Sequence, residues 1–351
     1  MSAEPAVLRP RATGSGDSVQ KIVHIASAFV FVAMADAAFA QSTVRPVPRI
    51  PRPLDWNTVS AAPASAAATP HERLEALFTA PARREITLEA GGTLHPAAAL
   101  ETNTGEVATQ RFGWAAGLVQ ELDGGSIVAL RVANEASFYD FAASAPLIGT
   151  STDPINDVYE TRIGATYYGP IGERLSYYHG LEFVVAGEPD AGIAESTTLG
   201  LTSGLAYRAT ENLELTLGLF AFSRLEDDAV VMPYIGVEWH VTSAIALAAE
   251  GNRVALVAEL TDALELELFA RYGQRQFRLE RAGGVNEPVF RDEQIDLGAT
   301  FAYALGEGAG LELGAGFTAW RELTFLESGE TLSEVELDPE PFVSLGLTFG
   351  I

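Results

Sequence analysis

The sequence predicts an all-β protein built around a single antiparallel transmembrane β-barrel of about 12 strands, with about 10–14 as the range. Three observations support this fold class. Apolar and polar residues alternate from about Arg84 onward, which is the pattern of strands with two different faces. After residue 40, no apolar run approaches the roughly 18–20 residues that a membrane helix needs. The stretch Pro341–Ile351 is an alternating strand, and its edge needs a partner strand.

The composition limits the classes of partner. The chain has 351 residues, 48% of them hydrophobic, with 47 acidic residues, 22 basic residues and no cysteine. A net charge of −25 argues against nucleic acid and against docking onto an anionic membrane surface through a basic patch. The lack of cysteine removes disulfides and thiolate metal sites, and it fits an exported protein. No pattern in the sequence predicts a cofactor.

Residues 1–40 are predicted to be a secretory signal peptide. Lys21 precedes an apolar core, and Ala38-Phe39-Ala40 has the form of a cleavage site after Ala40. The polar stretch before Lys21 is long for such a signal, and a start codon assigned too early, with the true start near Val19, would explain it. The alternative is a short membrane anchor, which the short and alanine-rich core disfavours.

Residues 41–82 are predicted to be a periplasmic linker. Pro, Ala and Ser dominate this stretch without periodicity, which predicts a disordered and partly extended chain. The stretch His71–Arg84 could hold a short helix, because Leu74, Leu77 and Phe78 are at helical spacing, and Pro81 would end it.

Residues 83–351 form the predicted barrel. Its clearest strand is Leu213–Leu219, where four leucines alternate with Glu214, Thr216 and Gly218, whereas a helix would scatter the leucines around its circumference. The same period predicts strands at residues 86–90, 112–118, 128–133, 159–167, 175–185, 199–207, 235–241, 264–272, 295–303 and 311–317. Residues 244–259 alternate less regularly, and the pattern there allows a short hairpin around Gly251 and Asn252.

The stretch Pro341–Ile351 supplies the final predicted strand. Large apolar residues, from Val343 to Ile351, occupy one face, and Ser, Gly and Thr occupy the other. An unpaired edge strand is an aggregation liability, and closure onto the first strand of a barrel would remove it.

The predicted connections alternate between short turns and long loops, as in membrane barrels. Short turns are expected at residues 122–125, 170–173 and 306–308, and polar loops at residues 102–109, 142–157, 188–196, 283–292 and 326–341. Aromatic residues near strand ends are predicted to form girdles at the membrane interfaces: Tyr167, Tyr168, Tyr177, Tyr207, Trp239, Tyr303 and Trp320.

The signal, the alternating strands and the segment Leu347-Thr-Phe-Gly-Ile351 resemble a Gram-negative bacterial outer-membrane β-barrel protein of an uncharacterised family. The final residue is Ile351 where such barrels usually end in Phe or Trp, and Phe349 stands two residues before it. The segments Gly236–Trp239 and Gly316–Arg321 are also similar to those of uncharacterised barrels. The resemblance covers about residues 84–351. It implies location in the bacterial outer membrane, with its lipids, lipopolysaccharide and the barrel-assembly machinery as partners, and it implies no activity.

The alternation also predicts which charged residues line the lumen. They are Glu160, Arg162, Glu182, Glu214, Glu238, His240, Glu265, Glu267, Arg271, Asp296 and Glu312. Either Arg and Glu pair across strands and fill a narrow interior, or water fills it and the acidic excess favours cations. A barrel of about twelve strands allows both, because eight strands hold only side chains and sixteen to eighteen leave a channel.

A lipid-modifying enzyme is a third hypothesis. His240 shares a face with Glu238, as a base would with its orienting carboxylate, but the sequence places no serine beside them. His179 is in register with Tyr177 and Leu181, which predicts a position at the lipid interface. The chain has no G-x-S-x-G, H-E-x-x-H or P-loop motif, so no catalytic residue and no metal ligand is predicted.

Residues 326–341 are rich in carboxylates. Oxygen ligands crowded in one loop could bind calcium or magnesium, but their spacing matches no EF-hand. The alternative is a solvated external loop.

The predicted function is therefore a narrow, cation-leaning pore for small hydrophilic solutes. The alternatives are a closed structural or interaction barrel without transport and the lipid-modifying enzyme. The sequence carries no pattern for a particular solute or for a subunit interface.

Overall fold

The computed structural model describes residues 84–101, 105–122, 124–142, 146–155, 157–282, 284–306 and 308–350. The predicted signal peptide and linker, with the short helix at residues 71–84, lie outside these residues except for Arg84, and they stay predictions. Arg84 itself begins the first strand. Within the described ranges, the chain has no helix with the length and apolar character of a membrane span.

The described residues contain seventeen strands. They are β1 (Arg84–Ala99), β2 (Glu106–Glu121), β3 (Ile127–Ala142), β4 (Asp157–Pro170), β5 (Leu175–Gly187), β6 (Thr197–Thr210), β7 (Leu213–Phe222), β8 (Val230–His240), β9 (Ile245–Glu250), β10 (Arg253–Thr261), β11 (Leu264–Arg278), β12 (Arg281–Ala282), β13 (Val285–Asn286), β14 (Val289–Gly306), β15 (Ala309–Glu327), β16 (Glu330–Leu337) and β17 (Glu340–Gly350).

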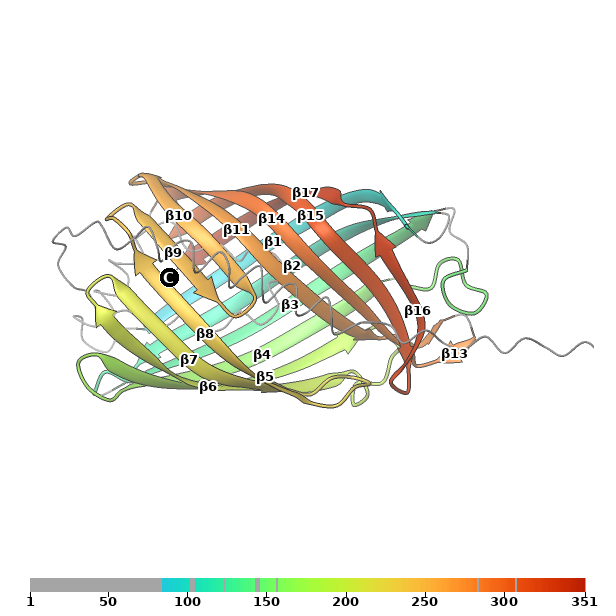
Figure 1. Cartoon of the computed structure of the whole chain (residues 1–351), viewed down its shortest axis with the longest axis horizontal. Coiled ribbons are helices and arrows are strands. Elements are labelled where there is room, and N and C mark those ends of the chain that lie inside the picture. The colour runs from blue at the N-terminus through green and yellow to red at the C-terminus, as the bar shows by residue number, and fades with distance from the viewer. Residues whose placement is uncertain are drawn as a thin grey trace, which may run out of the picture. The chain divides into compact units, whose positions relative to one another are not determined.

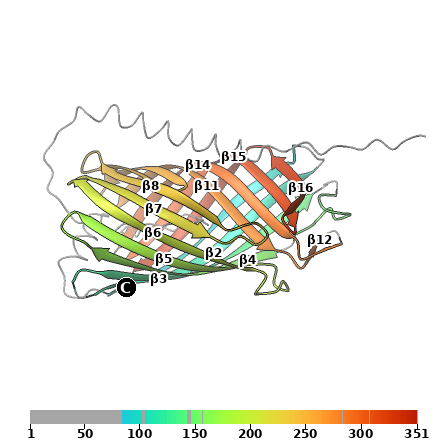
Figure 2. The same cartoon turned by 60° about the horizontal axis from the view of Figure 1, so that its bottom comes forward.

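The strands close into one antiparallel barrel (Figures 1 and 2). Strands β1 to β11 pair in chain order, and the ring continues through β14, β15 and β17 back to β1. The closing pair runs from Thr87 opposite Gly350 to Leu94 opposite Val343. The prediction that the strand at residues 341–351 closes onto the first strand is therefore confirmed.

The predicted strand number of about twelve is wrong. The sheet has 15 strands, of which 14 form the ring. The extra strand is β16, which pairs with the C-terminal part of β15, while β17 pairs with its N-terminal part. The strands left out of the predicted number are β9 and β10, the hairpin around Gly251 and Asn252. Alanine occupies inward positions of this hairpin at Ala246, Ala248 and Ala255, so its two faces differ less in polarity than those of the other strands.

The outward face of the strands forms an apolar belt. Large apolar side chains remain about half exposed on it, for example Leu181 at 49%, Leu297 at 47% and Leu345 at 51%. A contiguous apolar surface of this kind around a closed barrel is suited to contact with lipid. One predicted girdle residue is misplaced, because Tyr168 is on the inward face and only 5% exposed.

The two ends of the barrel differ. The turns after β2, β4, β6, β8, β10 and β14 lie at the end where β1 begins and β17 ends, which we call the terminus end. The longer connections lie at the opposite, far end, with β13 and β16 (Figure 1). Residues 326–341 were predicted to be a loop, and this prediction is wrong. They contain β16, whose Val335 and Leu337 are buried and whose glutamates face outward.

Two strands that are not neighbours in the ring meet at the far end. Gly187 of β5 forms a parallel bridge with Arg278 of β11, and the amide of Glu188 donates to the carbonyl of Arg278 at 2.9 Å. A side chain at Gly187 would not fit, since its Cβ would lie 2.6 Å from that carbonyl oxygen. This crossing divides the far end into two parts. One contains the arc from β11 through β14 and β1 to β5, and the other contains β5 to β11 in chain order.

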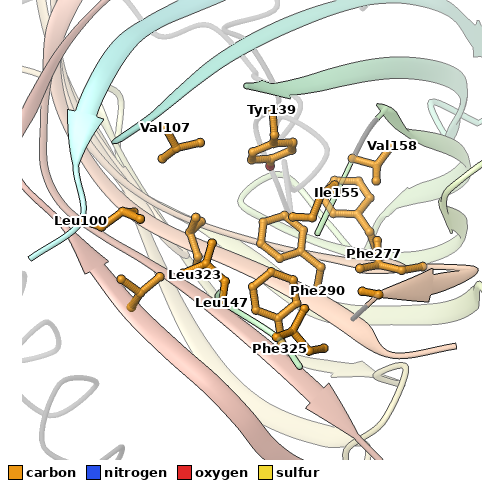
Figure 3. Close-up of a cluster of buried hydrophobic side chains, with 14 of the residues drawn as sticks. Leu100, Val107, Tyr139, Leu147, Ile155, Val158, Phe277, Phe290, Leu323 and Phe325 are labelled. Atoms are coloured by element: carbon orange, nitrogen blue, oxygen red, sulfur yellow. The ribbon is translucent and has the colours of Figure 1, made fainter. Parts of the chain in front are cut away.

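An apolar core fills the first of these parts (Figure 3). Its strands contribute Val107, Phe277, Phe290, Leu323 and Phe325, all of which are fully buried. The loop between β3 and β4 also enters this core with the buried side chains Leu147, Ile148 and Ile155. The arc has nine strands, close to the eight whose interior is just wide enough for side chains to fill. We call this set of residues the far-end core.

Candidate functional site: the barrel interior

Below the far-end core, the buried carboxylate of Asp292 links side chains from three other strands of the barrel. Asp292 of β14 accepts hydrogen bonds from Arg321 of β15, at 3.0 Å to each carboxylate oxygen, and from Arg111 of β2 at 2.7 Å. The Tyr139 hydroxyl of β3 donates to the same carboxylate at 2.7 Å. The side chains of Asp292, Arg111 and Arg321 are at most 3% exposed. Buried charges are tolerated when they are paired and hydrogen-bonded, and these groups are both.

Two further carboxylates extend this network. Asp296 accepts hydrogen bonds from Arg271 and Gln294 at 2.7 Å and from Thr318 at 2.9 Å. Glu340 of β17 accepts from Arg321 at 2.8 Å, and its carboxylate lies 3.2 Å from Nδ1 of His95. The network therefore spans β1, β2, β3, β11, β14, β15 and β17.

An ion pair also reaches across the interior. The side chains of Arg275 on β11 and Glu135 on β3 lie 3.6 Å apart and are at most 4% exposed. Along the shorter way around the ring, five strands separate β3 from β11. The ion pair therefore shows that β3 and β11 approach each other across the interior. Together with the far-end core, these residues form what we call the packed region.

The interior nearer the terminus end is less tightly filled. Arg131 faces inward between Gly117 and Gly164, and its side chain stays 46% exposed although it pairs with Glu89 at 2.8 Å. Glu238 pairs with His240 at 3.1 Å, and its side chain is 32% exposed. We call this part of the interior the terminus-side region.

Carboxylates accumulate in the terminus-side region. Glu259 of β10 lies directly opposite Glu265 of β11. Glu265 is opposite Ala302 of β14, which is in turn opposite Glu312 of β15, so three carboxylates share one row. The neighbouring Glu267 pairs with Arg253. Like charges directly opposite each other in a sheet are destabilising, so this row has an electrostatic cost.

By strand register, the residues predicted to line the lumen all lie on the inward face. The guanidinium of Arg162 forms ion pairs with the carboxylates of Glu160, at 2.5 Å, and of Glu182, at 2.9 Å. Arg271 and Asp296 belong to the packed region. The remaining predicted residues belong to the terminus-side region: Glu214, Glu238, His240, Glu265, Glu267 and Glu312.

The geometry offers little to the enzyme hypothesis. His240 and Glu238 do form a pair, with 3.1 Å between Nε2 and a carboxylate oxygen. A second histidine pair lies outside, where the Nδ1 atom of His179 is 3.0 Å from the hydroxyl of Ser203 on the lipid-facing side. In the part of the chain that the structure describes, no three His, Asp or Glu side chains are grouped so that they could hold a metal ion.

Sequence reasoning missed the centre of the packed region. Arg111, Asp292, Arg321 and Glu340 were not among the predicted residues, nor were the members of the Arg275–Glu135 pair. The period of two that places Phe112 outward and Asp296 inward also assigns Arg111 and Asp292 to the inward face. Their meeting could not be read from any local pattern, because 181 residues separate them in the chain.

A family model described as "Domain of unknown function (DUF6268)" matches residues 150–350, which is more than half of the chain. The chain belongs to this family. No curated protein sequence matches it.

Several solved structures are similar in shape. The toluene transporter TodX of Pseudomonas putida has 8% identity and a TM-score of 0.40, with 79% of this chain and 91% of that chain covered. The KdgM porin in complex with disordered oligogalacturonate has 6% identity and a TM-score of 0.33, with 75% and 98% covered. LpxR from Salmonella typhimurium has 12% identity and a TM-score of 0.35, with 75% and 99% covered. Scores this low support no conclusion about the function of this chain.

Proposed function

We propose that the protein is a bacterial outer-membrane barrel that passes small hydrophilic solutes along a narrow path with a preference for cations. The observation that carries this proposal is the row of carboxylates in the terminus-side region, Glu259, Glu265 and Glu312. Rings of acidic side chains are a common basis of cation preference in pores.

The packed region supports a narrow path. The far-end core and the Asp292 network occupy the arc of the barrel between β11 and β5. Solutes would therefore pass through the part enclosed by β5 to β11. Location in the outer membrane, contact with its lipids and lipopolysaccharide, and insertion by the barrel-assembly machinery belong to the same proposal. The apolar belt and the resemblance of the sequence support them.

Ion current through the refolded protein in a planar bilayer with a salt gradient tests this proposal. We expect discrete current steps and a reversal potential that favours cations. The double variant Glu265→Gln/Glu267→Gln should move the reversal potential towards zero. The matched control Glu334→Gln/Glu336→Gln removes two carboxylates from the outward face of β16 at the far end and should leave the potential unchanged. Unchanged selectivity in the first variant would contradict the cation preference.

A closed structural or interaction barrel is the second candidate, and the Asp292 network favours it. That network ties β2, β3, β14 and β15 together with charged groups that have almost no exposure. If the protein is shown to be inserted and folded but no ion current is detected, the result would support the closed barrel and overturn the pore.

A further inference from the structure

The hydrogen-bonded wall of the barrel is interrupted between β8 and β11. The pairing of β8 with β9 ends at Gly236 opposite Glu250, and that of β10 with β11 ends at Arg253 opposite Arg271. Both β8 and β11 continue beyond this hairpin, to Val230 and Arg278 respectively. In the described residues, no strand pairs with Val230–Ile235 on the edge that faces β11. We call this interruption the wall break.

The side chains along this unpaired edge are accessible on both faces of β8. Val231 and Ile235 on the outward face are 66% and 70% exposed, the highest values among the large apolar residues of the described strands. Met232 lies on the inward face, opposite the buried Phe220, and is nevertheless 44% exposed.

A loop frames the wall break at the far end. Residues 223–229 connect β7 to β8, and they reach across to the outward face of β11 and β14. The amide of Leu225 donates to Gln276 at 3.2 Å, Glu226 pairs with Arg278, and Asp227 pairs with Arg291. We call residues 223–229 the latch loop. On the opposite side, the amide of Asn252 in the β9–β10 turn donates to the carbonyl of Tyr272, which completes the frame.

The inward surface beside the wall break is aromatic. Phe220 and Phe222 stack with their ring centres 4.6 Å apart, and Tyr178 and Tyr234 lie 6.4 Å apart in the same cluster. The Tyr178 hydroxyl is buried and has no hydrogen-bond partner among the described residues. This surface is suited to an apolar or aromatic molecule, and the hydroxyl supplies one donor that the protein itself does not use.

We propose that the wall break is a lateral port through which small apolar molecules, aromatic ones in particular, pass between the bilayer and the barrel interior, with the latch loop controlling its width. The port differs from the proposed hydrophilic path in solute class and in direction, and a barrel that is silent to ions could still have it.

The backbone of β8 gives a physical reason for the opening. The hydrocarbon of a bilayer offers no hydrogen bonds, and an irregular or unpaired backbone is tolerated at membrane depth only where it is buried in protein or lines a wet cavity. The unpaired edge of Val230–Ile235 therefore needs access to the aqueous interior. The outward side chains Val231 and Ile235 beside it are suited to lipid. On its β8 side, the wall break thus joins a wet surface to an apolar one, as a route for molecules dissolved in the bilayer requires. The outward residues of β11 beside it, Gln274 and Gln276, are polar.

Spin labels test the port directly, because the chain has no native cysteine. Single variants of the full chain would carry a nitroxide at Met232→Cys, at the lipid-facing control Leu217→Cys, or at the inward control Arg131→Cys. Met232 and Leu217 are 44% and 62% exposed, and the side chain of Arg131 is 46% exposed, so all three positions are accessible. Collisions with oxygen, which concentrates in lipid, and with a water-soluble nickel chelate would be measured in phosphatidylcholine vesicles.

We expect the label at position 232 to show an oxygen-to-nickel collision ratio several-fold above that at position 131 and close to that at position 217. A ratio equal to that at position 131 would overturn the port. Adding Glu226→Gln and Asp227→Asn, which remove the ion pairs of the latch loop, should raise the ratio at position 232 further, and no change would overturn the role of the loop.

Naphthalene dissolved in the bilayer tests the solute class. It should slow the motion of the label at position 232 in a saturable way and leave the label at position 217 unaffected. An equal effect at both positions would overturn the proposed passage of aromatic molecules.

Discussion

Asp292 and Glu265 are carboxylates on the inward face of two neighbouring strands, and the barrel holds them in opposite ways. Asp292 is fully buried and accepts hydrogen bonds from two arginines and a tyrosine. Glu265 faces another carboxylate, Glu259, directly across the sheet. The packed region thus neutralises its charges pair by pair, whereas the terminus-side region accumulates negative charge.

The difference follows from how closely the walls approach each other. Where β2, β3, β14 and β15 come within side-chain reach, water is excluded and each charge needs an opposite charge. Where side chains such as Arg131 and Glu238 stay exposed, water can solvate them and strict matching is not required. The same alternation of residues therefore produces a structural interior in one place and an acidic surface in the other.

The largest expected effect is that of Asp292→Asn. It leaves Arg111 and Arg321 buried with less compensating charge, which should lower the free energy of unfolding by about 3–5 kcal/mol. Urea unfolding in lipid vesicles, followed by tryptophan fluorescence, measures this change. The matched variant Glu265→Gln should cost less than about 1 kcal/mol, because it relieves a like-charge contact. Equal losses in the two variants would break the comparison.

Removal of a core side chain should cost almost as much. Leu323 is fully buried in the far-end core, so Leu323→Ala should lower the free energy of unfolding by about 2–5 kcal/mol. The control Leu345→Ala truncates a lipid-facing side chain that is 51% exposed, and its effect should be clearly smaller. The same urea titration compares them, and a larger loss for Leu345→Ala would show that the far-end core is not tightly packed.

A smaller effect is expected where an aromatic ring lies over a glycine. A Cβ at Gly218 would overlap the ring of Tyr234, so Gly218→Ala should cost about 1–3 kcal/mol. At Gly200 the nearest atom would be 3.6 Å away, so Gly200→Ala should be close to neutral. Thermal unfolding of the two variants separates these outcomes, and equal stability would mean that the aromatic cluster can shift without cost.

The smallest expected effect is that of Tyr178→Phe, for which Tyr139→Phe serves as the contrasting variant. Tyr139 donates to Asp292, so Tyr139→Phe should cost about 1.5–3 kcal/mol, as is typical of hydrogen bonds to charged groups. The Tyr178 hydroxyl has no partner among the described residues, so Tyr178→Phe should change stability by less than about 0.5 kcal/mol or improve it. A substantial loss in Tyr178→Phe would assign that hydroxyl a structural role and weaken its proposed availability to a solute.

The sequence was a good guide wherever a strand has one apolar and one polar face. Leu213–Leu219 shows the pattern most clearly, and it lies in β7 as predicted. The pattern failed at the β9–β10 hairpin, where alanines blur the difference between the faces, and in β16, where abundant glutamates suggested a loop. In both places the residue composition does not indicate a strand, although backbone pairing with neighbouring strands stabilises one.

Tyr168 shows a different limit. Its position near the end of a strand suggested a membrane interface, but the neighbouring Tyr167 takes the outward position and Tyr168 packs inside against Tyr178. Adjacent tyrosines in a strand must face opposite sides, so only one of them could belong to a girdle.

The interior network lay beyond local reasoning altogether. Alternation can assign a residue to the inward face, but it does not say which strands face each other across the barrel. The contact of Arg111 with Asp292 depends on the ring of 14 strands and on the crossing of β5 and β11, and both are properties of the closed barrel.

The pairing of β1 with β17 also has a consequence for the order of assembly. The other neighbours in the ring lie close together in the sequence, whereas Thr87 and Gly350 meet across almost the whole barrel. Local hairpins form early and distant contacts late, because the entropy of loop closure must be overcome first. The growing sheet is therefore an open ribbon with two unprotected edges, and a single late contact turns it into a barrel.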